Sequence, residues 1–265
     1  MEPLAYCEDR GDRLVVVNAN TAKRNTLTPE YYRVLGDALD LATRESRITS
    51  VLLRGDGGFF CAGGDLRMLA TRRELPRAER LGKIEGLHDL IRSIMACPKP
   101  VIAAIEGGAA GAGVSLAFAC DLMVADADAK FTVAYVKAGL VPDGGLTSTL
   151  SAQLPRAMLM RMALLGEPVS ARHLHTSGAI SQIVGPGEVI AAAEQLANAL
   201  ACGPSAAHGV IKALINSART NTLTDQMDAE RDAMADAVGA PEAAEGISAF
   251  LAKRAPDFKS LRGHA

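Results

Sequence analysis

The chain alternates short apolar runs with longer segments in which apolar residues recur at helical spacing. The apolar runs at residues 14–17, 48–54, 101–105 and 122–125 have the length and composition of buried strands. Helical patterns lie between them, so strands and helices alternate through the first half of the chain. This order predicts a core of the α/β class.

The helical segments carry start signals that the sequence makes visible. Thr28 followed by Pro29 has the form of an N-cap with proline at the first helical position. Apolar residues within 34–42 then share one face, and a second apolar stripe covers 84–95. Because residues 72–83 are charged and interrupted by a proline, we expect them to form a mobile surface segment near the entrance of a site.

The pattern changes at Gly166, after which almost all apolar residues follow helical spacing, apart from a short apolar run at 180–184. Helices are predicted over residues 189–200, 206–216, 223–238 and 242–253. We therefore expect a core over residues 1–200 and a helical C-terminal region over residues 201–265.

Two glycine-rich stretches carry the strongest functional signal: residues 61–65 (Cys-Ala-Gly-Gly-Asp) and residues 107–113 (Gly-Gly-Ala-Ala-Gly-Ala-Gly). Each follows an apolar strand pattern and precedes a helical one. Glycine lets the backbone approach a ligand closely, and a helix N-terminus leaves amide N–H groups unpaired. Two such amides facing one oxygen would stabilise a developing oxyanion. The glycines alone would be compatible with simple turns, but their pairing favours a site.

Composition narrows the class of protein. With 49% apolar and 22% charged residues and a net charge of −2, the chain is an ordinary globular protein with no strong attraction to nucleic acid or anionic membranes. Its five cysteines are scattered without a CxxC spacing, which predicts reduced thiols rather than disulfides or a zinc site. No signal peptide or membrane span is predicted, so we expect a cytoplasmic protein.

Several ordered motifs resemble those of the enoyl-CoA hydratase/isomerase (crotonase) superfamily over nearly the whole chain. They are residues 18–27 (NANTAKRNTL), 60–66 (FCAGGDL), 99–105 (KPVIAAI), 107–113, 129–131 (AKF), 139–145 (GLVPDGG) and 250–254 (FLAKR). The resemblance specifies the superfamily more strongly than it specifies the reaction.

The resemblance implies a spiral of repeated ββα units, followed by C-terminal helices over residues 201–265 that assemble the chain into a homotrimer or a dimer of trimers. It also implies an acyl-CoA thioester substrate, with coenzyme A as part of the substrate and neither a separate cofactor nor a metal. By motif position, the backbone N–H groups of Gly64 and Ala112 would form the oxyanion hole around the thioester carbonyl. This suits the chemistry, because a thioester enolate carries its negative charge on that oxygen.

Seven further positions match coenzyme A contacts in the superfamily. They are Lys23 and Arg24 near the phosphates, Ala62, Asp65 and Leu66 at the adenine, and Phe250 and Lys253 from a neighbouring subunit. Without the motif, Lys23 and Arg24 would be read as a solvated surface pair.

The residues at the catalytic positions depart from those of a typical hydratase, which uses two glutamates. Here these positions hold Ser115 and Tyr135, and neither can act as a carboxylate base. Asp143 is the remaining carboxylate in a motif position, where several isomerase branches carry an acidic residue. A 1,3-proton shift needs one such base and an oxyanion hole. We therefore predict that the chain moves the double bond of an enoyl-CoA, with Asp143 as the acid and base.

Three alternatives remain open. The first is hydration, with Ser115 and Asp143 positioning a water molecule. The second follows the 4-chlorobenzoyl-CoA dehalogenase branch, which resembles this chain in having a histidine at the position of His88, an aspartate at Asp143 and an aromatic residue at Tyr135. In that branch the aspartate is the nucleophile and the histidine activates water. The third is a non-catalytic relative that binds acyl-CoA or RNA, although no basic stripe supports RNA binding.

Each of these residues also has a purely structural interpretation. Asp143 in a Pro-Asp-Gly sequence would form a turn, and Ser115 would be a small residue in helix packing. Tyr135 would form a wall of the site, with its hydroxyl turned inward, and His88 would be a satisfied core residue on an apolar helix face.

Overall fold

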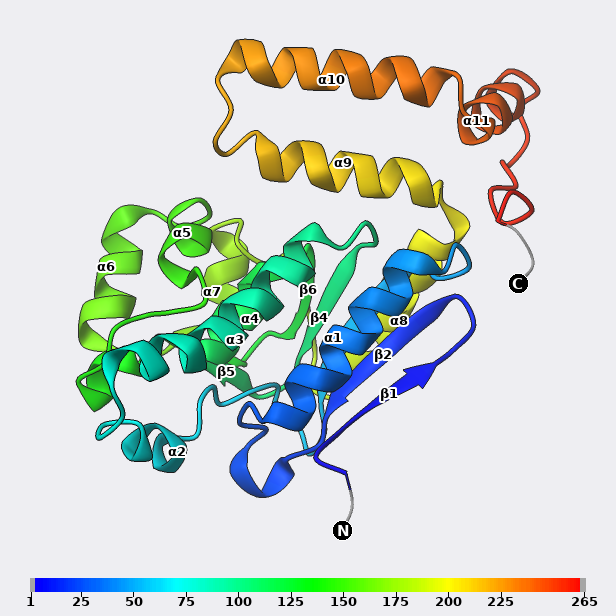
Figure 1. Ribbon diagram of the computed structural model, residues 1–265. Coiled ribbons are helices and arrows are strands. Elements are labelled where there is room, and N and C mark those ends of the chain that lie inside the picture. Colours follow the sequence, from blue (N-terminus) through cyan, green and yellow to red (C-terminus); the bar gives the residue numbers. More distant parts are fainter. Residues whose placement is uncertain (1–2, 263–265) are drawn as a thin grey trace.

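The computed structural model describes residues 3–262. Its main sheet has six strands in the order β1-β2-β3-β4-β6-β9 (Figure 1). These strands are β1 Ala5–Asp9, β2 Arg13–Asn18, β3 Ser50–Gly55, β4 Val101–Ile105, β6 Leu122–Asp126 and β9 Gln182–Val184. Only β1 and β2 pair antiparallel; the other neighbours pair in parallel. Both glycine-rich stretches therefore follow the carboxyl ends of adjacent parallel strands, where α/β sheets commonly bind ligands.

A second sheet of three short strands lies beside the first. Its strands are β5 Gly108–Ala110, β7 Lys130–Thr132 and β8 Val169–Ser170. β5 runs parallel to β7, and β7 runs antiparallel to β8. Part of the second glycine-rich stretch is thus a strand rather than a loop, because its backbone pairs with β7 although its small residues carry no strand signal.

Helices cover both faces of the main sheet. Those around the core are α1 Pro29–Arg44, α2 Leu66–Thr71, α3 Arg77–Ala96, α4 Ala112–Ala119, α5 Leu146–Ser151, α6 Arg156–Leu165, α7 Ala171–Thr176 and α8 Val189–Cys202, with 3-10 turns η1 Thr21–Lys23 and η2 Ala134–Ala138. Strand alternation decides which face each side chain covers. In β2, Leu14 and Val16 join the core that includes α1 and α3, whereas Val15 and Val17 pack with α8.

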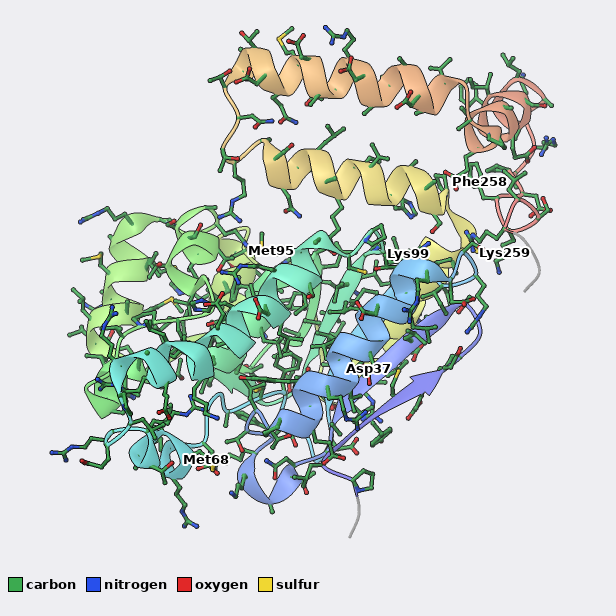
Figure 2. All side chains as sticks on the ribbon, viewed as in Figure 1. Asp37, Met68, Met95, Lys99, Phe258 and Lys259 are labelled. Carbon is green, nitrogen blue, oxygen red and sulfur yellow. The ribbon has the colours of Figure 1, made fainter. Side chains whose placement is uncertain are left out.

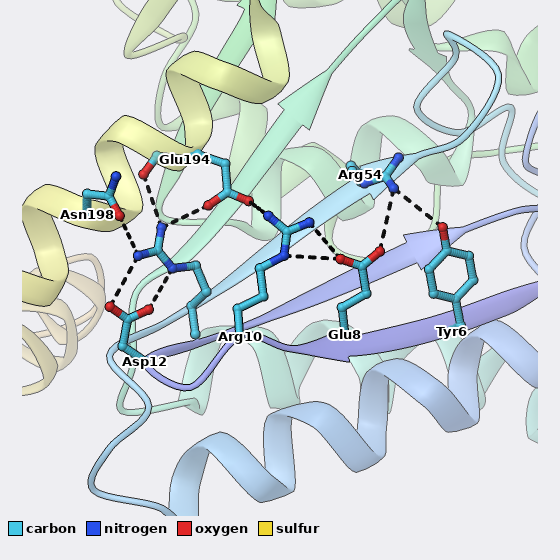
Figure 3. Close-up of polar contacts among 8 residues, drawn as sticks. Tyr6, Glu8, Arg10, Asp12, Arg54, Glu194 and Asn198 are labelled. Carbon is cyan, nitrogen blue, oxygen red and sulfur yellow. Dashed lines mark hydrogen bonds and ion pairs between the residues drawn. The ribbon is translucent and has the colours of Figure 1, made fainter.

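An ionic network fixes α8 to the edge of the sheet (Figure 3). The buried guanidinium of Arg13 donates hydrogen bonds to the carboxylates of Asp12 and Glu194 at 2.8 and 2.9 Å. Arg13 also donates to the Asn198 side chain, and Arg10 reaches the second oxygen of Glu194. The buried charge of Arg13 is thereby compensated by partners from both the strand edge and the helix.

The last three helices, α9 Ser205–Ser217, α10 Leu223–Val238 and α11 Pro241–Leu251, form a C-terminal arm that extends beyond the sheet (Figure 1). The buried ammonium of Lys212 in α9 joins the arm to the core. Its Nζ atom lies 2.7 Å from the Asp121 carboxylate. It also donates to the carbonyl oxygens of Ile94 and Lys99 at 2.8 and 3.3 Å. Met95 and Lys99 lie beneath α9 in Figure 2.

Glu242 in α11 connects the two ends of the arm. Its carboxylate accepts hydrogen bonds from the amides of Ala206 and Ala207, both at 3.0 Å, and so caps the N-terminus of α9. A cavity of about 590 Å³ separates α9 from the core, and Phe118 and Ile211 are among the residues that line it.

The structure confirms the predicted α/β core and most of its elements. Thr28 caps α1 by accepting a hydrogen bond from the Tyr31 amide, and Pro29 is its first residue, as expected. Some elements were not predicted. β1 was missed because Glu8 and Asp9 give it a polar pattern, and α2, α5, α6, α7, β7 and β8 were missed as well. α3 begins at Arg77, within the stretch predicted to be mobile.

The predicted boundary at residue 200 falls inside the last turn of α8. Residues 1–2 of the predicted core and residues 263–265 of the predicted C-terminal region lie outside the described residues. Within residues 3–262, no helix is both long and apolar enough to cross a membrane.

Candidate functional site

The two glycine-rich stretches lie in direct contact. The Ala110 amide donates a hydrogen bond of 2.9 Å to the Cys61 carbonyl oxygen. Gly63 has a φ of +84°, and a Cβ atom there would lie 2.6 Å from the Ala110 carbonyl oxygen and 2.9 Å from the Ala112 nitrogen. Both distances are shorter than van der Waals contact, so only glycine fits at position 63.

This contact brings two unpaired amides to the same region. Ala112 is the first residue of α4, so its N–H group has no partner within the helix. Gly64 follows Gly63, whose carbonyl oxygen accepts a hydrogen bond from the Leu27 amide at 2.8 Å. Within residues 3–262, neither the Gly64 nor the Ala112 amide donates to a hydrogen bond. The positive end of α4 adds to the electrostatic attraction for an anion at this place.

A hydrogen-bonded group of three side chains lies at α4. Ser115 is fully buried in α4, and its hydroxyl donates to the Asp143 carbonyl oxygen at 3.0 Å. The Tyr135 hydroxyl lies 3.2 Å from the Ser115 oxygen and donates to Asp143 Oδ1 at 2.7 Å. Asp143 is partly buried, and its Oδ2 atom makes no hydrogen bond within the described residues. The structure thus brings together three of the candidate catalytic residues that the sequence predicts.

Tyr135 remains a hydrogen-bond donor over the usual pH range. Burial raises the pKa of its phenol well above the ordinary value, and the charge of Asp143 raises it further. Next to it, Gly144 has a φ of +61°, and a Cβ atom there would lie 2.9 Å from Ser115 Cβ. The Asp143 backbone therefore packs directly against α4.

Apolar side chains from α2 and α3 approach this group from outside. Leu69 lies against Gly64, 3.4 Å from the place of a Cβ atom there, and Leu87 lies 3.2 Å from the corresponding place at Gly144. Both contacts are hydrophobic and limit the access of water to the site.

Tyr32 in α1 also belongs to this region, and sequence reasoning missed it. Its ring lies against Gly86 of α3. Burial raises the pKa of Tyr32 to about 12, with the charge of Asp143 as the second cause. The sequence held only a weak signal for this position. Tyr31 lies on the buried face of α1, and Tyr32 follows it by about 100° around the helix, which turns it toward α3.

The predicted coenzyme A positions in the first half of the chain also cluster. Lys23 Nζ forms an ion pair with Asp65 Oδ2 at 2.7 Å, and hydrogen bonding to Lys23 lowers the pKa of Asp65. The Ala62 amide donates to the Arg24 carbonyl oxygen at 3.0 Å. Asp65 caps α2, whose first residue, Leu66, is 60% exposed. These five positions form one surface beside the contact between residues 61–65 and 107–113.

Three predicted residues lie apart from this group within the chain. Phe250 lies at the end of α11 and is 83% exposed, while Lys253 follows it, so both belong to the far end of the C-terminal arm (Figure 1). The imidazole of His88 is one-third exposed, and its Nδ1 atom lies 3.7 Å from Glu85. Within the described residues, His88 makes no hydrogen bond to Asp143.

Across residues 3–262, no group of three or more His, Cys, Asp or Glu side chains is placed to hold a metal ion.

Known proteins that resemble this chain over most of its length belong to one family. The family described as Enoyl-CoA hydratase/isomerase matches residues 11–261. The 1,2-epoxyphenylacetyl-CoA isomerase of Escherichia coli (strain K12) is 41% identical over 235 residues, which cover 88% of this chain and 90% of that protein. A probable enoyl-CoA hydratase of Rhodobacter capsulatus is 35% identical over 248 residues, covering 93% and 91%. The crystal structure of an enoyl-CoA hydratase from Polaromonas sp. JS666 has a TM-score of 0.92 and 41% identity, covering 95% of this chain and 98% of that chain.

The contact between the glycine-rich stretches makes a prediction about stability. Gly63→Ala places a methyl group against the Ala110 carbonyl oxygen at a positive φ, so we expect the free energy of unfolding to fall by about 1–3 kcal/mol. Gly36→Ala in α1 is the matched control, because its Cβ would meet nothing within 4 Å; there we expect a gain of about 0.5–1 kcal/mol. Urea unfolding followed by circular dichroism measures both, and equal effects would contradict the prediction.

Proposed function

Because the chain belongs to the enoyl-CoA hydratase/isomerase (crotonase) superfamily and has its fold, we propose that this acyl-CoA enzyme shifts the double bond of an enoyl-CoA thioester. The observation that carries the proposal is the hydrogen-bonded group of Ser115, Tyr135 and Asp143, in which Asp143 is the only carboxylate. A proton shift needs one group that accepts a proton and returns it.

In this proposal the thioester oxygen binds between the amides of Gly64 and Ala112. Their lack of partners supports the assignment, since each can donate to the oxygen as negative charge develops on it. A donor of this kind contributes about 2.7–4 kcal/mol to transition-state stabilisation in other enzymes. The rigid contact at Gly63 holds the two stretches together before substrate arrives.

Asp143 then moves the proton. Its Oδ2 removes a proton from C2 of a 3-enoyl thioester, and the electron pair moves through the thioester carbonyl to form a dienolate. The same oxygen returns the proton to C4, which leaves the double bond between C2 and C3. Tyr135 engages Oδ1, so Oδ2 is the oxygen free for this transfer.

The hydrogen bonds of Ser115 disfavour the hydration alternative. Its hydroxyl donates to the Asp143 carbonyl oxygen and lies beside the Tyr135 hydroxyl. Its single proton is therefore committed within the protein, and the site has one carboxylate rather than the two that position and activate water.

The surface formed by Lys23, Arg24, Ala62, Asp65 and Leu66 is proposed to bind coenzyme A. The Ala62 and Arg24 backbones are joined by a hydrogen bond, which fixes the loop at the adenine position. Lys23 is half exposed, so its ammonium can turn from Asp65 to a phosphate at little cost in desolvation.

We also propose that the C-terminal arm joins copies of this chain into a trimer or a dimer of trimers. Large apolar side chains are exposed along α10 and α11, which is unusual for a monomer. They are Leu223, Met227, Met234, Val238, Ile247, Phe250 and Leu251, all more than half exposed. In such an assembly, Phe250 and Lys253 would reach the coenzyme A bound by a neighbouring copy, since Phe250 is exposed in α11, which belongs to the arm that extends beyond the sheet (Figure 1).

The assignment of Asp143 is tested by Asp143→Asn. We expect turnover of cis-3-enoyl-CoA to fall by about 10²–10⁴-fold, with binding of a saturated acyl-CoA unchanged, because the amide keeps the shape but cannot take the proton. Asp128→Asn, at an exposed turn, is the control and retains activity. Product analysis in deuterated water gives the reaction: a positional isomer with little label supports the proposal, and a 3-hydroxyacyl product contradicts it.

The role of Tyr135 is tested by Tyr135→Phe. Loss of the donor to Oδ1 leaves the Asp143 carboxylate free to turn, so we expect kcat to fall by about 10²-fold while binding of a saturated acyl-CoA is unchanged. Tyr6→Phe removes another Tyr–Asp hydrogen bond, in β1, and leaves kcat unchanged. A lower free energy of unfolding with kcat unchanged would show that Tyr135 only supports the fold.

The assembly is tested by size-exclusion chromatography with light scattering. We expect a mass of three or six times 27.6 kDa. Met234→Glu places a charge among the exposed apolar side chains of α10 and lowers that mass, while Leu81→Glu, at an exposed leucine of α3, does not. A monomeric wild-type protein would refute the proposal.

A further inference from the structure

The phenol of Tyr32 carries a donor that the protein does not use. The ring packs between α1 and α3, beside Gly86, and against the main core. Its hydroxyl forms no hydrogen bond within residues 3–262, yet it is not among the fully buried unpartnered atoms, so it has access to solvent or ligand. This hydroxyl is therefore available to donate a hydrogen bond to a ligand.

Arg72 provides a second unused donor on the same side. It lies at the end of α2, three residues after Leu69, so both side chains share one face of that helix. That face is directed at the glycine contact, because Leu69 lies against Gly64. The charge of Arg72 also acts on the Tyr32 phenol, where it opposes the rise in pKa.

The environment of Arg72 differs from that of its neighbour. Arg73 is almost fully exposed and lies 3.6 Å from Glu74. Arg72 is partly buried, and within the described residues its side chain has neither an ion pair nor a hydrogen bond. A guanidinium that is partly removed from water gains most from a carboxylate or phosphate, which it can bind through two parallel hydrogen bonds.

The place of Arg72 on α2 distinguishes between these two anions. The proposed coenzyme A surface lies at the N-terminus of α2, where Asp65 caps the helix and pairs with Lys23. Arg72 lies at the opposite end, about 4–5 Å beyond Leu69 along the helix axis. With the thioester at Gly64 and the coenzyme on the proposed surface at Asp65, Arg72 lies on the side that is left for the acyl chain.

We propose that Arg72 and Tyr32 together bind a carboxylate at the far end of the acyl chain, so that the site takes enoyl-CoA thioesters of dicarboxylic acids. Both groups are donors, and a carboxylate has four acceptor positions and no proton to donate. This inference rests on the proposed function, because it takes the oxyanion site as the place of the thioester.

Binding rather than turnover gives the sharpest test. Isothermal titration calorimetry compares adipyl-CoA with hexanoyl-CoA, which has the same chain length without the terminal carboxylate. We expect the wild-type protein to bind adipyl-CoA at least tenfold more tightly. Arg72→Gln removes this preference by weakening adipyl-CoA alone, and Tyr32→Phe reduces it severalfold. Arg73→Gln, one residue away, leaves both affinities within twofold of the wild-type values.

Three results would overturn the proposal. One is a wild-type protein without preference for adipyl-CoA. The second is an equal loss for both ligands in Arg72→Gln, which would place Arg72 at the coenzyme phosphates. The third is a preference that survives in Arg72→Gln. Since no chemistry is measured, a preference that holds while the Asp143 experiments fail would leave this site intact and refute only the proposed isomerisation.

Discussion

The close approach of residues 61–65 to residues 110–113 is the constraint on which the rest of the site depends. A side chain at position 63 would collide with the Ala110 carbonyl oxygen and the Ala112 nitrogen. Glycine at this position lets the two stretches come close enough to share a hydrogen bond. The same approach places the unpaired amides of Gly64 and Ala112 near each other. The parallel sheet makes this contact possible, since β3 and β4 are neighbours and end at the same edge.

The hydrogen-bonded group of Ser115, Tyr135 and Asp143 depends on α4, which begins at this contact. α4 begins at Ala112 and carries Ser115 one turn later, and Ser115 fixes the backbone of Asp143. Tyr135 then orients the Asp143 carboxylate. The Ala112 amide, the Ser115 hydroxyl and the Asp143 backbone are thus all positioned through one helix, α4.

Features with local chemical signals could be predicted from the sequence. Thr28 and Pro29 marked the start of α1, and the motifs pointed to Ser115, Tyr135 and Asp143, which hydrogen bonds join in the structure. Features that depend on tertiary contacts could not. β5 is a strand only because β7 pairs with it, and the role of Tyr32 depends on the angle at which α1 meets α3. The ion pair between Lys23 and Asp65 joins residues far apart in the chain, so spacing alone could not reveal it.

The Glu242 cap has a consequence for how the C-terminal arm unfolds. The residue that satisfies the first amides of α9 comes from α11, the last helix of the arm. Unfolding that reaches the first turn of α11, where Glu242 lies, would therefore uncap α9 and weaken the helix whose Lys212 anchors the arm to the core. The stability of α9 is therefore linked to that of α11, although α10 separates them in the chain.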